Sequence, residues 1–331
     1  MNTIGIIANP ASGKDIRRLV SHATVVDNNE KINIVKRIVL AAQGCGVKKI
    51  YIMPDTFMIG YKVIDDLHIS KELKIDVEVL KMDIKGNMTD TVNATKMMEQ
   101  KGVDCIIVLG GDGTSRAVAK VITHAPLIAI STGTNNVYPE MMEGTVVGMA
   151  AAAIASSIFN IDETCYRDKR IEIYKDDQLV DIALIDCVIS KQTFVGSKAI
   201  WDVEDIYKVV VSRAHPAAIG FSTIIGSKLI VGKEDNFGAA VNVNTGNKKV
   251  LVPIAAGTIR EIIVDEPEIL DLNKKMTFEA SDNGIIALDG EREIPFKPGD
   301  RFDIVITRNG PYRVIVDKTL EYAQRSGFFN R

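Results

Sequence analysis

The strongest chemical signal in the chain is a run of five residues, Gly110 to Thr114, with the sequence GGDGT. Glycine reaches left-handed backbone conformations without strain and lets a phosphate approach bare backbone N–H groups. A helix that begins here also points its positive end at a bound phosphate. A carboxylate in such a site repels an anion, so we expect Asp112 to hold a cation or to accept a proton. The alternative is an ordinary tight turn in which Asp112 caps nearby N–H groups.

The sequence on either side of this turn predicts the elements that position it. Cys105 to Leu109 contains only apolar residues without polar alternation, which is typical of a strand buried on both faces of a parallel sheet. After the turn, apolar residues recur at helical spacing from Ala117 to Ile122. The order of strand, glycine turn and helix places the turn at the carboxyl end of a strand, where open α/β sheets bind their ligands.

Two further polar loops also follow apolar strands. Residues 9–15, NPASGKD, come after the predicted strand Ile4 to Ala8, and their small residues and glycine suit a second turn that faces phosphate. Residues 131–137, STGTNNV, come after the predicted strand Leu127 to Ile130. The two asparagines of this loop are candidates to contact a base, a ribose or a substrate hydroxyl, and the alternative is that they cap local backbone. We expect the three loops to converge on one crevice.

The composition indicates an ordinary globular protein of two domains. The chain has 331 residues, of which 46% are hydrophobic and 25% charged, and a net charge of −3. The negative charge argues against general binding to nucleic acid or to an anionic membrane. The longest apolar run, Val146 to Phe159, is too short to span a bilayer, and the first residues lack a signal-peptide pattern. The four widely spaced cysteines indicate buried free thiols, so we expect a cytoplasmic protein.

The hydrophobic pattern changes near residue 160. Residues 1–159 alternate strands with helices, which predicts a Rossmann-like parallel sheet covered by helices. Residues 160–316 carry short apolar–polar alternations separated by turn signals, which predicts an antiparallel β-sandwich. One helix is expected inside it, from Asp202 to Arg213, because apolar residues recur there at helical spacing. The tail, residues 317–331, is expected to form a short helix and to dock on the first domain through its two phenylalanines.

The GGDGT segment resembles the signature of a superfamily that holds NAD kinases, diacylglycerol and sphingosine kinases and, more distantly, phosphofructokinases. The NPASG segment is similar to the loop after the first strand of lipid kinases and of NAD kinase relatives. Gly133 to Asn136, GTNN, resembles a loop of the acetoin catabolism protein X family, and Ile286 to Glu291, IALDGE, resembles the late DGQ or DGE motif of the superfamily. These motifs occur in family order. The chain is therefore similar to the ATP-NAD kinase-like family, of the acetoin catabolism protein X type.

The resemblance implies transfer of the γ-phosphoryl group of ATP, or of polyphosphate, to an alcohol, with ATP and Mg²⁺ as cofactors and the active site between the two domains. It makes Asp112 the group that accepts a proton or orients Mg²⁺, Glu291 a second catalytic residue and Asp289 a substrate-binding residue. An Asp-Gly-Glu step between strands is also an ordinary hairpin turn, which is the alternative for the last two. The nucleotide-binding residues that the resemblance implies are Asn9, Ser12, Gly110, Gly111, Gly113, Thr114, Gly133, Thr134, Asn135 and Asn136.

The phosphoryl acceptor follows less directly from the motifs. Lipid kinases continue GGDGT with Asn-Glu, where this chain has Arg116-Ala117. NAD kinases carry a downstream Asn-Glu pair, to which Asn135-Asn136 is the nearest equivalent. We therefore expect the partner to be a nucleotide or dinucleotide, with NAD or a related small molecule as acceptor, and a homo-oligomer is compatible with the sequence. The first alternative is a non-catalytic nucleotide-binding or regulatory protein linked to acetoin catabolism. The second is a lipid kinase of the diacylglycerol kinase type, which needs a basic or apolar patch facing the membrane.

Overall fold

The first domain is built on one sheet of mostly parallel strands. In the computed structural model, which describes residues 2–12, 26–133, 136–156, 158–191 and 203–330, the strand order is β3-β2-β1-β4-β5-β18-β6. Neighbouring strands are parallel except for β18 and β6. β1, β4 and β5 are adjacent and buried along their whole length, so their carboxyl ends lie side by side. The strand bounds are β1 Thr3–Ala8, β2 Lys49–Ile52, β3 Asp76–Val79, β4 Cys105–Gly110, β5 Leu127–Ser131, β6 Cys165–Arg167 and β18 Tyr312–Val314.

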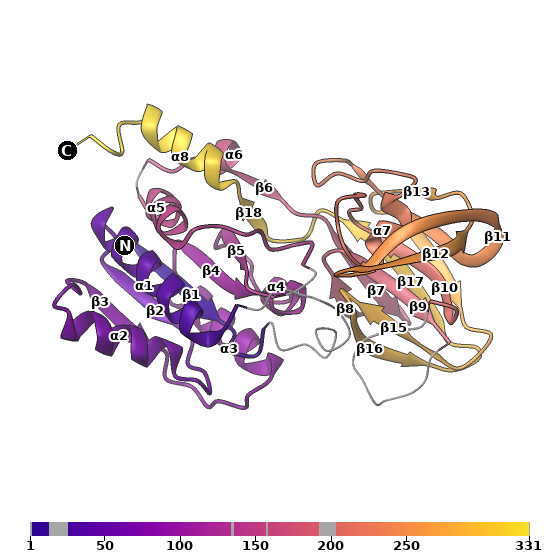
Figure 1. The fold of residues 1–331 in the computed structure, drawn as a ribbon, viewed down its shortest axis with the longest axis horizontal. Helices are drawn as coiled ribbons and strands as arrows, with labels where there is room; N and C mark the ends of the chain where they lie inside the picture. The colour runs from indigo at the N-terminus through magenta and orange to yellow at the C-terminus, as the bar shows by residue number, and fades with distance from the viewer. Residues whose placement is uncertain (1, 13–25, 134–135, 157, 192–202, 331) are drawn as a thin grey trace.

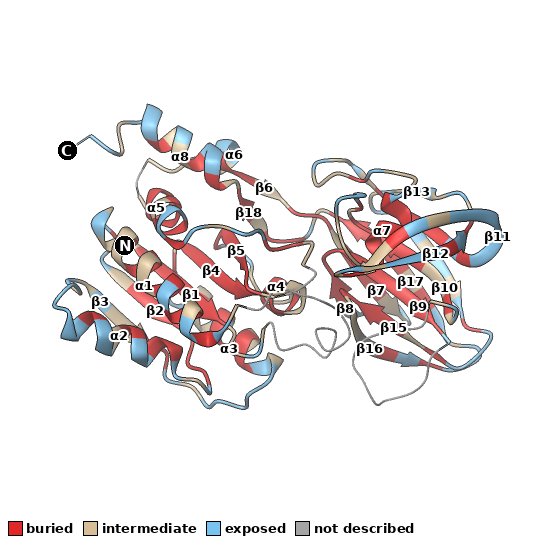
Figure 2. Ribbon diagram, viewed as in Figure 1, coloured by how far each residue is buried: buried red, intermediate tan, exposed pale blue. Residues whose placement is uncertain are grey.

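Helices cover both faces of this sheet (Figure 1). α5 lies directly on the backbone of α1, because a Cβ at Gly148 would come within 2.6 Å of the Ile38 carbonyl oxygen. Figure 2 shows buried residues along the strands and along the sheet-facing sides of the helices. Among the described helices, none combines the length and the apolar character needed to cross a membrane. One face of the sheet packs against α1 Asn28–Gly44, α2 Ile59–Ile69, α5 Gly144–Ile154 and α8 Val316–Arg325, and the other against α3 Met88–Gln100 and α4 Asp112–Ala119.

The first domain extends beyond the predicted boundary at residue 159. α6 Ile161–Thr164 leads into β6, and β6 and β18 both belong to the first sheet. The chain enters the second domain at Asp168 and returns at Pro311, where the Asp168 N–H donates to the Pro311 carbonyl oxygen at 2.9 Å. After β18 the tail forms α8, and Phe328 packs against the core that α1 and α5 share. The two crossings of the chain between the domains therefore lie side by side.

The second domain consists of two antiparallel sheets packed face to face, as predicted. One has the order β12-β11-β10-β9-β15-β16, with β13 beside β11, and the other has the order β14-β17-β7-β8. Their shared core contains Ile171, Ile189, Ile286 and Phe302. The strand bounds are β7 Arg170–Lys175, β8 Gln178–Ala183, β9 Asp186–Ser190, β10 Ile206–Val211, β11 Phe237–Ala255, β12 Thr258–Val264, β13 Glu268–Asp271, β14 Lys275–Glu279, β15 Gly284–Leu288, β16 Glu291–Phe296 and β17 Arg301–Thr307, and a short helix, α7, spans Ser222–Gly226.

The helix predicted from Asp202 to Arg213 is wrong for its described part. Ile206–Val211 is instead β10, which pairs with β9 on one side and with β11 on the other. Asp202 itself lies outside the described residues. Three consecutive valines, 209–211, are buried in this strand, and β-branched residues favour a pleated, buried surface. Pairing with two neighbouring strands therefore outweighs the helical spacing of the apolar residues.

The four cysteines are free, which agrees with the expectation from their spacing. Cys105, Cys165 and Cys187 are buried, and Cys45 is partly buried. Burial raises the pKa of the Cys165 thiol to about 11. This thiol therefore stays protonated near neutral pH, where it packs as a small apolar side chain.

Candidate active site

The three polar loops that the sequence singles out meet at one edge of the first sheet. β1, β4 and β5 are hydrogen-bonded neighbours, so the loops that follow them are neighbours too. The Asn9 side-chain amide donates to the Thr114 hydroxyl at 2.9 Å. The hydroxyls of Ser12 and Thr132 lie 2.9 Å apart and share a hydrogen bond. Side chains thus join the NPASG loop to both of the other loops and form one continuous polar surface.

The glycines of the GGDGT segment provide space rather than a left-handed backbone. None of the three has a positive φ: Gly110 ends β4, and Gly111 is extended, with a φ of −108° and a ψ of −169°. A Cβ at Gly110 would lie 2.5 Å from the Cβ of Thr114, and one at Gly113 would lie 2.6 Å from Oε1 of Glu291. Access to left-handed conformations is therefore not the reason for glycine at these positions, which instead allow the close approach of neighbouring groups.

The loop after β5 lies against the glycine segment. A Cβ at Gly111 would lie 2.9 Å from Oδ1 of Asn136, and one at Gly133 would lie 3.0 Å from Nδ2 of the same side chain. Asn136 therefore fills the space between two glycines, and its Nδ2 donates to the Ser131 hydroxyl of its own loop at 2.8 Å. Thr134 and Asn135, the other polar residues predicted for this loop, lie outside the described residues.

Asp112 is the first residue of α4 and connects this helix to the loop after β5. Its carboxylate accepts the Val137 N–H at 3.1 and 3.2 Å and the Tyr138 N–H at 2.8 Å. Asp112 therefore caps backbone N–H groups, as in the alternative interpretation of the sequence, but these groups belong to the neighbouring loop and not to the glycine turn itself. An ionised carboxylate has about four acceptor positions, so two backbone donors leave capacity for a further hydrogen bond. The roles of Asp112 toward Mg²⁺ or a proton stay predictions.

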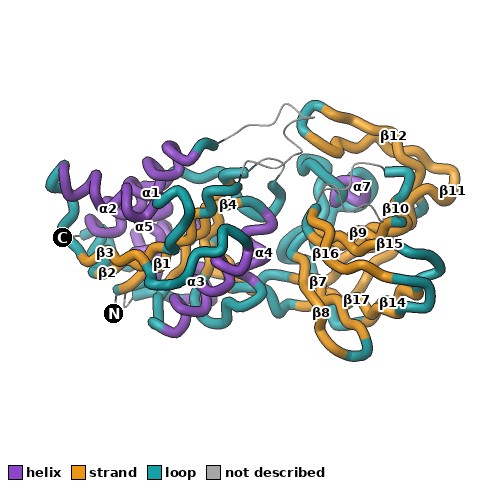
Figure 3. The backbone as a smooth tube through the Cα atoms, turned by 90° about the horizontal axis from the view of Figure 1, so that it is seen from below, coloured by secondary structure: helices purple, strands orange, loops and turns teal. Residues whose placement is uncertain are grey.

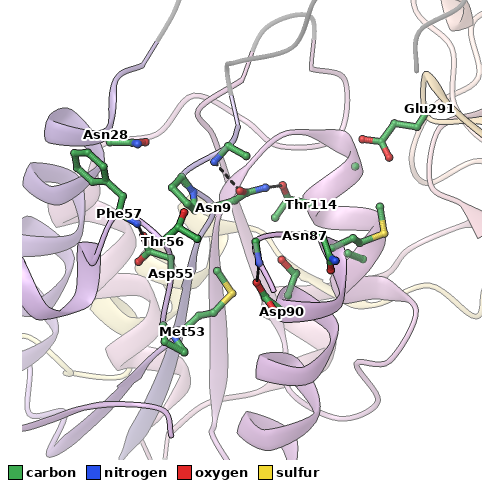
Figure 4. Close-up of a pocket in the computed structure, with 18 residues that line it drawn as sticks. Asn9, Asn28, Met53, Asp55, Thr56, Phe57, Asn87, Asp90, Thr114 and Glu291 are labelled. Carbon is green, nitrogen blue, oxygen red and sulfur yellow. Dashed lines mark hydrogen bonds between the residues drawn. The ribbon is translucent and has the colours of Figure 1, made fainter. Parts of the chain in front are cut away.

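A pocket of about 420 Å³ opens beside this polar surface. Its volume falls within the range of roughly 300–1,000 Å³ that is usual for ligand pockets. The pocket lies where α1, α2, α3 and α4 begin, so N–H groups and the positive ends of four helix dipoles surround it. Figure 4 shows Asn9 and Thr114 in its middle, Asn28 and Phe57 on one side and Glu291, from the second domain, on the other.

The half of this pocket formed by the loops after β2 and β3 was not predicted from the sequence. Asp55 accepts the N–H groups of Phe57 at 2.8 Å and Ile59 at 2.9 Å at the start of α2, and burial raises the pKa of its carboxyl group. Asp90 accepts the Gly86 N–H at 2.7 Å near the start of α3. The signal available in the sequence was an acidic residue near each strand-to-helix junction, Asp55 before α2 and Asp90 in the first turn of α3, since acidic residues are common at helix starts.

A buried lysine holds the loop after β1. Lys31 of α1 has no exposed surface, and its ammonium donates to the carbonyl oxygens of Asn9 at 2.9 Å and Ser12 at 2.8 Å. It also donates to the side-chain oxygen of Asn28 at 3.1 Å. The apolar periodicity of α1 gave no indication of this contact. One charged donor thus fixes two of the predicted nucleotide-binding residues at the edge of the pocket.

We expect Lys31→Met to lower the free energy of unfolding by about 1.5–3 kcal/mol, because three acceptors lose a charged donor while most of the apolar side chain is kept. Urea denaturation measures the change. The control is Lys36→Met on the same helix, whose surface pair with Asp66 contributes about 0–1 kcal/mol. Equal effects of the two substitutions would contradict the role assigned to Lys31.

The two acids of the late motif differ in position. Asp289 is buried, and its carboxylate accepts the N–H groups of Leu184, Ile185 and Asp186 at distances from 2.8 to 3.2 Å. Burial also raises the pKa of its carboxyl group. Glu291, by contrast, lines the pocket. The structure therefore places Asp289 behind the pocket, where it fixes the turn between β8 and β9, and not at the predicted substrate position.

Both domains match known protein families. Residues 4–160 match the family model described as the ATP-NAD kinase N-terminal domain, and residues 169–309 match the acetoin catabolism protein X C-terminal domain. The fold is similar to that of yeast NADH kinase complexed with NADH, with a TM-score of 0.53 and 15% identity, covering 99% of this chain and 88% of that one. At this identity the likeness shows the fold alone. The fold and the matching domains define an ATP-NAD kinase-like protein.

Sequence relatives give a narrower assignment. The chain is 23% identical to the NAD kinase of Methanosarcina acetivorans, over 66% of this chain and 74% of that protein. It is 35% identical to acetoin catabolism protein X of Cupriavidus necator, over 97% of this chain and 92% of that protein. The chain belongs to the acetoin catabolism protein X family. The resemblance predicted from the four motifs is confirmed, as is the pairing of a helix-covered parallel sheet with antiparallel sheets.

Proposed function

We propose that this chain is an ATP-dependent phosphotransferase that acts on an alcohol group of NAD or of a related small molecule. The observation that carries the proposal is the meeting of three polar loops beside a pocket ringed by helix starts, with Glu291 of the second domain on its wall. Membership of an ATP-NAD kinase-like family supports the same class of reaction. Phosphoryl transfer depends on alignment and charge stabilisation more than on covalent help, which suits a site of backbone donors between two domains.

The residues around the pocket fit a triphosphate mainly through their backbone. None of the described residues that line the pocket is Lys or Arg. Side chains already cap N–H groups at the starts of α1, α2 and α3, so the start of α4, which has no side-chain cap, offers the backbone donors to phosphate, and the helix dipoles add positive potential. Gly113 keeps its backbone bare, since a side chain there would collide with Glu291. In the proposed complex Asn9, Ser12 and Thr114 steady the phosphates.

Mg²⁺ in the proposed reaction arrives with ATP. In the part of the chain that the structure describes, no group of three acidic, His or Cys side chains is arranged to hold a metal ion. In kinase sites this ion commonly binds substrate phosphates together with one or two carboxylates. Asp55 and Asp90, which line the pocket, are hydrogen-bonded to backbone N–H groups. Glu291, the third acid on the wall, pairs with Arg116, so we expect the phosphates of ATP to supply most of the ligands of the ion.

A non-catalytic nucleotide-binding protein is the second candidate, and the surroundings of Asp112 favour it. The carboxylate accepts two N–H groups of the loop after β5, and it is not among the described residues that line the pocket. An acid that only fixes a loop has no part in transferring a phosphoryl group. The same fold would then bind nucleotide without turnover, in a regulatory role linked to acetoin catabolism.

Binding and turnover separate the two candidates. Thermal shift with ATP, ADP, NAD and NADH, each with and without Mg²⁺, identifies the ligands, and ADP release is then measured with each dinucleotide that binds. We expect ATP with Mg²⁺ to stabilise the protein, by about 2.7 kcal/mol at a hundred times its Kd, and ADP release to depend on NAD or a related dinucleotide. Stabilisation without ADP release would support the second candidate. No stabilisation by any nucleotide would contradict both.

A further inference from the structure

Arg116 lies one turn after Asp112 on α4 and contacts three acids of the second domain. Its Nη1 lies 3.3 Å from Oδ2 of Asp181. Its Nη2 lies 3.3 Å from Oε2 of Glu291, and its Nε lies 3.9 Å from Oδ2 of Asp289. Each of the three guanidinium nitrogens thus faces a different carboxylate.

The contacts of Arg116 are buried at the junction of the two domains. Its side chain and that of Asp289 have no exposed surface, whereas Asp181 is 12% exposed and Glu291 31%. Lys120, just after α4, adds a second cation, 2.8 Å from Asp181. Figure 3 shows α4 beside the strands of the second domain. A buried guanidinium needs its carboxylate partners in place, so the position of these acids is tied to α4.

Arg116 contacts one of the two oxygens of Glu291. The guanidinium faces Oε2, while Oε1 lies toward Gly113, where an added Cβ would be 2.6 Å away. Glu291 is the most exposed of the three acids, and it is the one that lines the pocket. The contact with Oε2 on one side and the close approach of Oε1 to Gly113 on the other together restrain the direction of the carboxylate.

We propose that Arg116 is a positioning residue that holds Glu291 of the second domain against Gly113 and sets the geometry in which this carboxylate meets the ligand. Lysine does not replace it, because a single ammonium cannot face three acids through three separate nitrogens. This role refines the proposed function and rests on it, because the kinetic test requires turnover. The unfolding test needs no ligand.

Arg116→Lys and Arg116→Gln, each made in the parent and in Glu291→Gln, form two double-mutant cycles. In the parent we expect Arg116→Lys to lower kcat by at least about 10-fold and to change KM for ATP by less than about threefold. In Glu291→Gln we expect the same substitution to change kcat by less than about threefold, since the group that Arg116 positions is already altered.

Arg170→Gln is the matched control. Arg170 pairs with Glu172 inside the second domain and lies away from the pocket. We expect this variant to keep the kcat of the parent even where it lowers stability. An equal loss of kcat from Arg116→Lys in the parent and in Glu291→Gln would overturn the inference, because it would show that Arg116 does not act through Glu291.

The urea midpoint of each variant tests the contact without a ligand. We expect Arg116→Gln to lower the midpoint more in the parent than in Glu291→Gln, and equal shifts would overturn the inference. If the shifts in the urea midpoint are not additive but no ADP is released, the same four variants are compared by their Kd for a non-hydrolysable ATP analogue. Coupled Kd values then support the positioning role and additive values overturn it. The proposed phosphotransferase activity can thus fail while the inference stands.

Discussion

We expect Asp112→Asn to lower kcat by about 10²–10⁴-fold, the loss typical of a removed general base. The substitution is informative because Oδ1 of Asp112 accepts both backbone donors, from Val137 at 3.2 Å and from Tyr138 at 2.8 Å. An asparagine that keeps its carbonyl oxygen at the Oδ1 position still accepts the Tyr138 N–H, but its amide then lies in the Oδ2 position, 3.1 Å from the Val137 N–H, so the variant loses the charge and weakens one hydrogen bond. ADP release at saturating ATP measures the change, and urea denaturation verifies that the loop is kept in place.

Asp112→Ala is the companion variant, because it removes the hydrogen bonds together with the charge. We expect it to lose as much kcat as Asp112→Asn and, in addition, to lower the free energy of unfolding by about 1.5–3 kcal/mol. A near-parent kcat in Asp112→Asn, combined with the destabilisation in Asp112→Ala, would assign Asp112 to the loop alone. That result would remove Asp112 from the reaction and leave Glu291, which lines the pocket, as the candidate acid.

The meeting of the three loops could be predicted from the sequence because local patterns carry it. Apolar runs such as Cys105 to Leu109 identify strands buried on both faces, and parallel strands place all their carboxyl ends at one edge of the sheet. Each polar loop therefore needed only to follow such a strand. The family of the chain was predictable for a related reason, since the motifs that carry the resemblance are short and contiguous.

Contacts between distant residues leave no such local pattern. Lys31 is one polar residue in an amphipathic helix, and only the folded chain shows that its ammonium reaches Asn9. Arg116 and Glu291 are 175 positions apart, and neither belongs to a periodic pattern that points to the other. A side chain at Gly113 would collide with Glu291, which is distant in the sequence. The GGDGT segment alone indicated only that glycine leaves the backbone open to phosphate. The late motif pointed to Glu291 as a site residue, but its contacts with Arg116 and Gly113 could not be predicted from the sequence.

We expect Glu291→Gln to tighten the binding of ATP and to lower kcat. An acid on the wall of a phosphate site repels the triphosphate even where it assists the reaction, so removing its charge tightens ATP binding by roughly threefold to tenfold. The same change lowers kcat by at least about 100-fold, as expected for a lost acid–base or charge-orienting group. Isothermal titration with ATP and steady-state ADP release measure the two effects. The control is Glu261→Gln on β12, an exposed acid paired with Lys249, which leaves both unchanged.

Gly113→Ala tests the same carboxylate without altering any charge. The added Cβ would lie 2.6 Å from Oε1 and 3.1 Å from Cδ of Glu291, so the side chain has to move although Arg116 still contacts its other oxygen. We expect kcat to fall in this variant too, and to fall less when Glu291 is already Gln. Weaker binding of ATP with Mg²⁺ in Glu291→Gln would contradict the expected tightening, since it would mean that the carboxylate holds the cation. A parent-like kcat in both variants would remove Glu291 from the reaction.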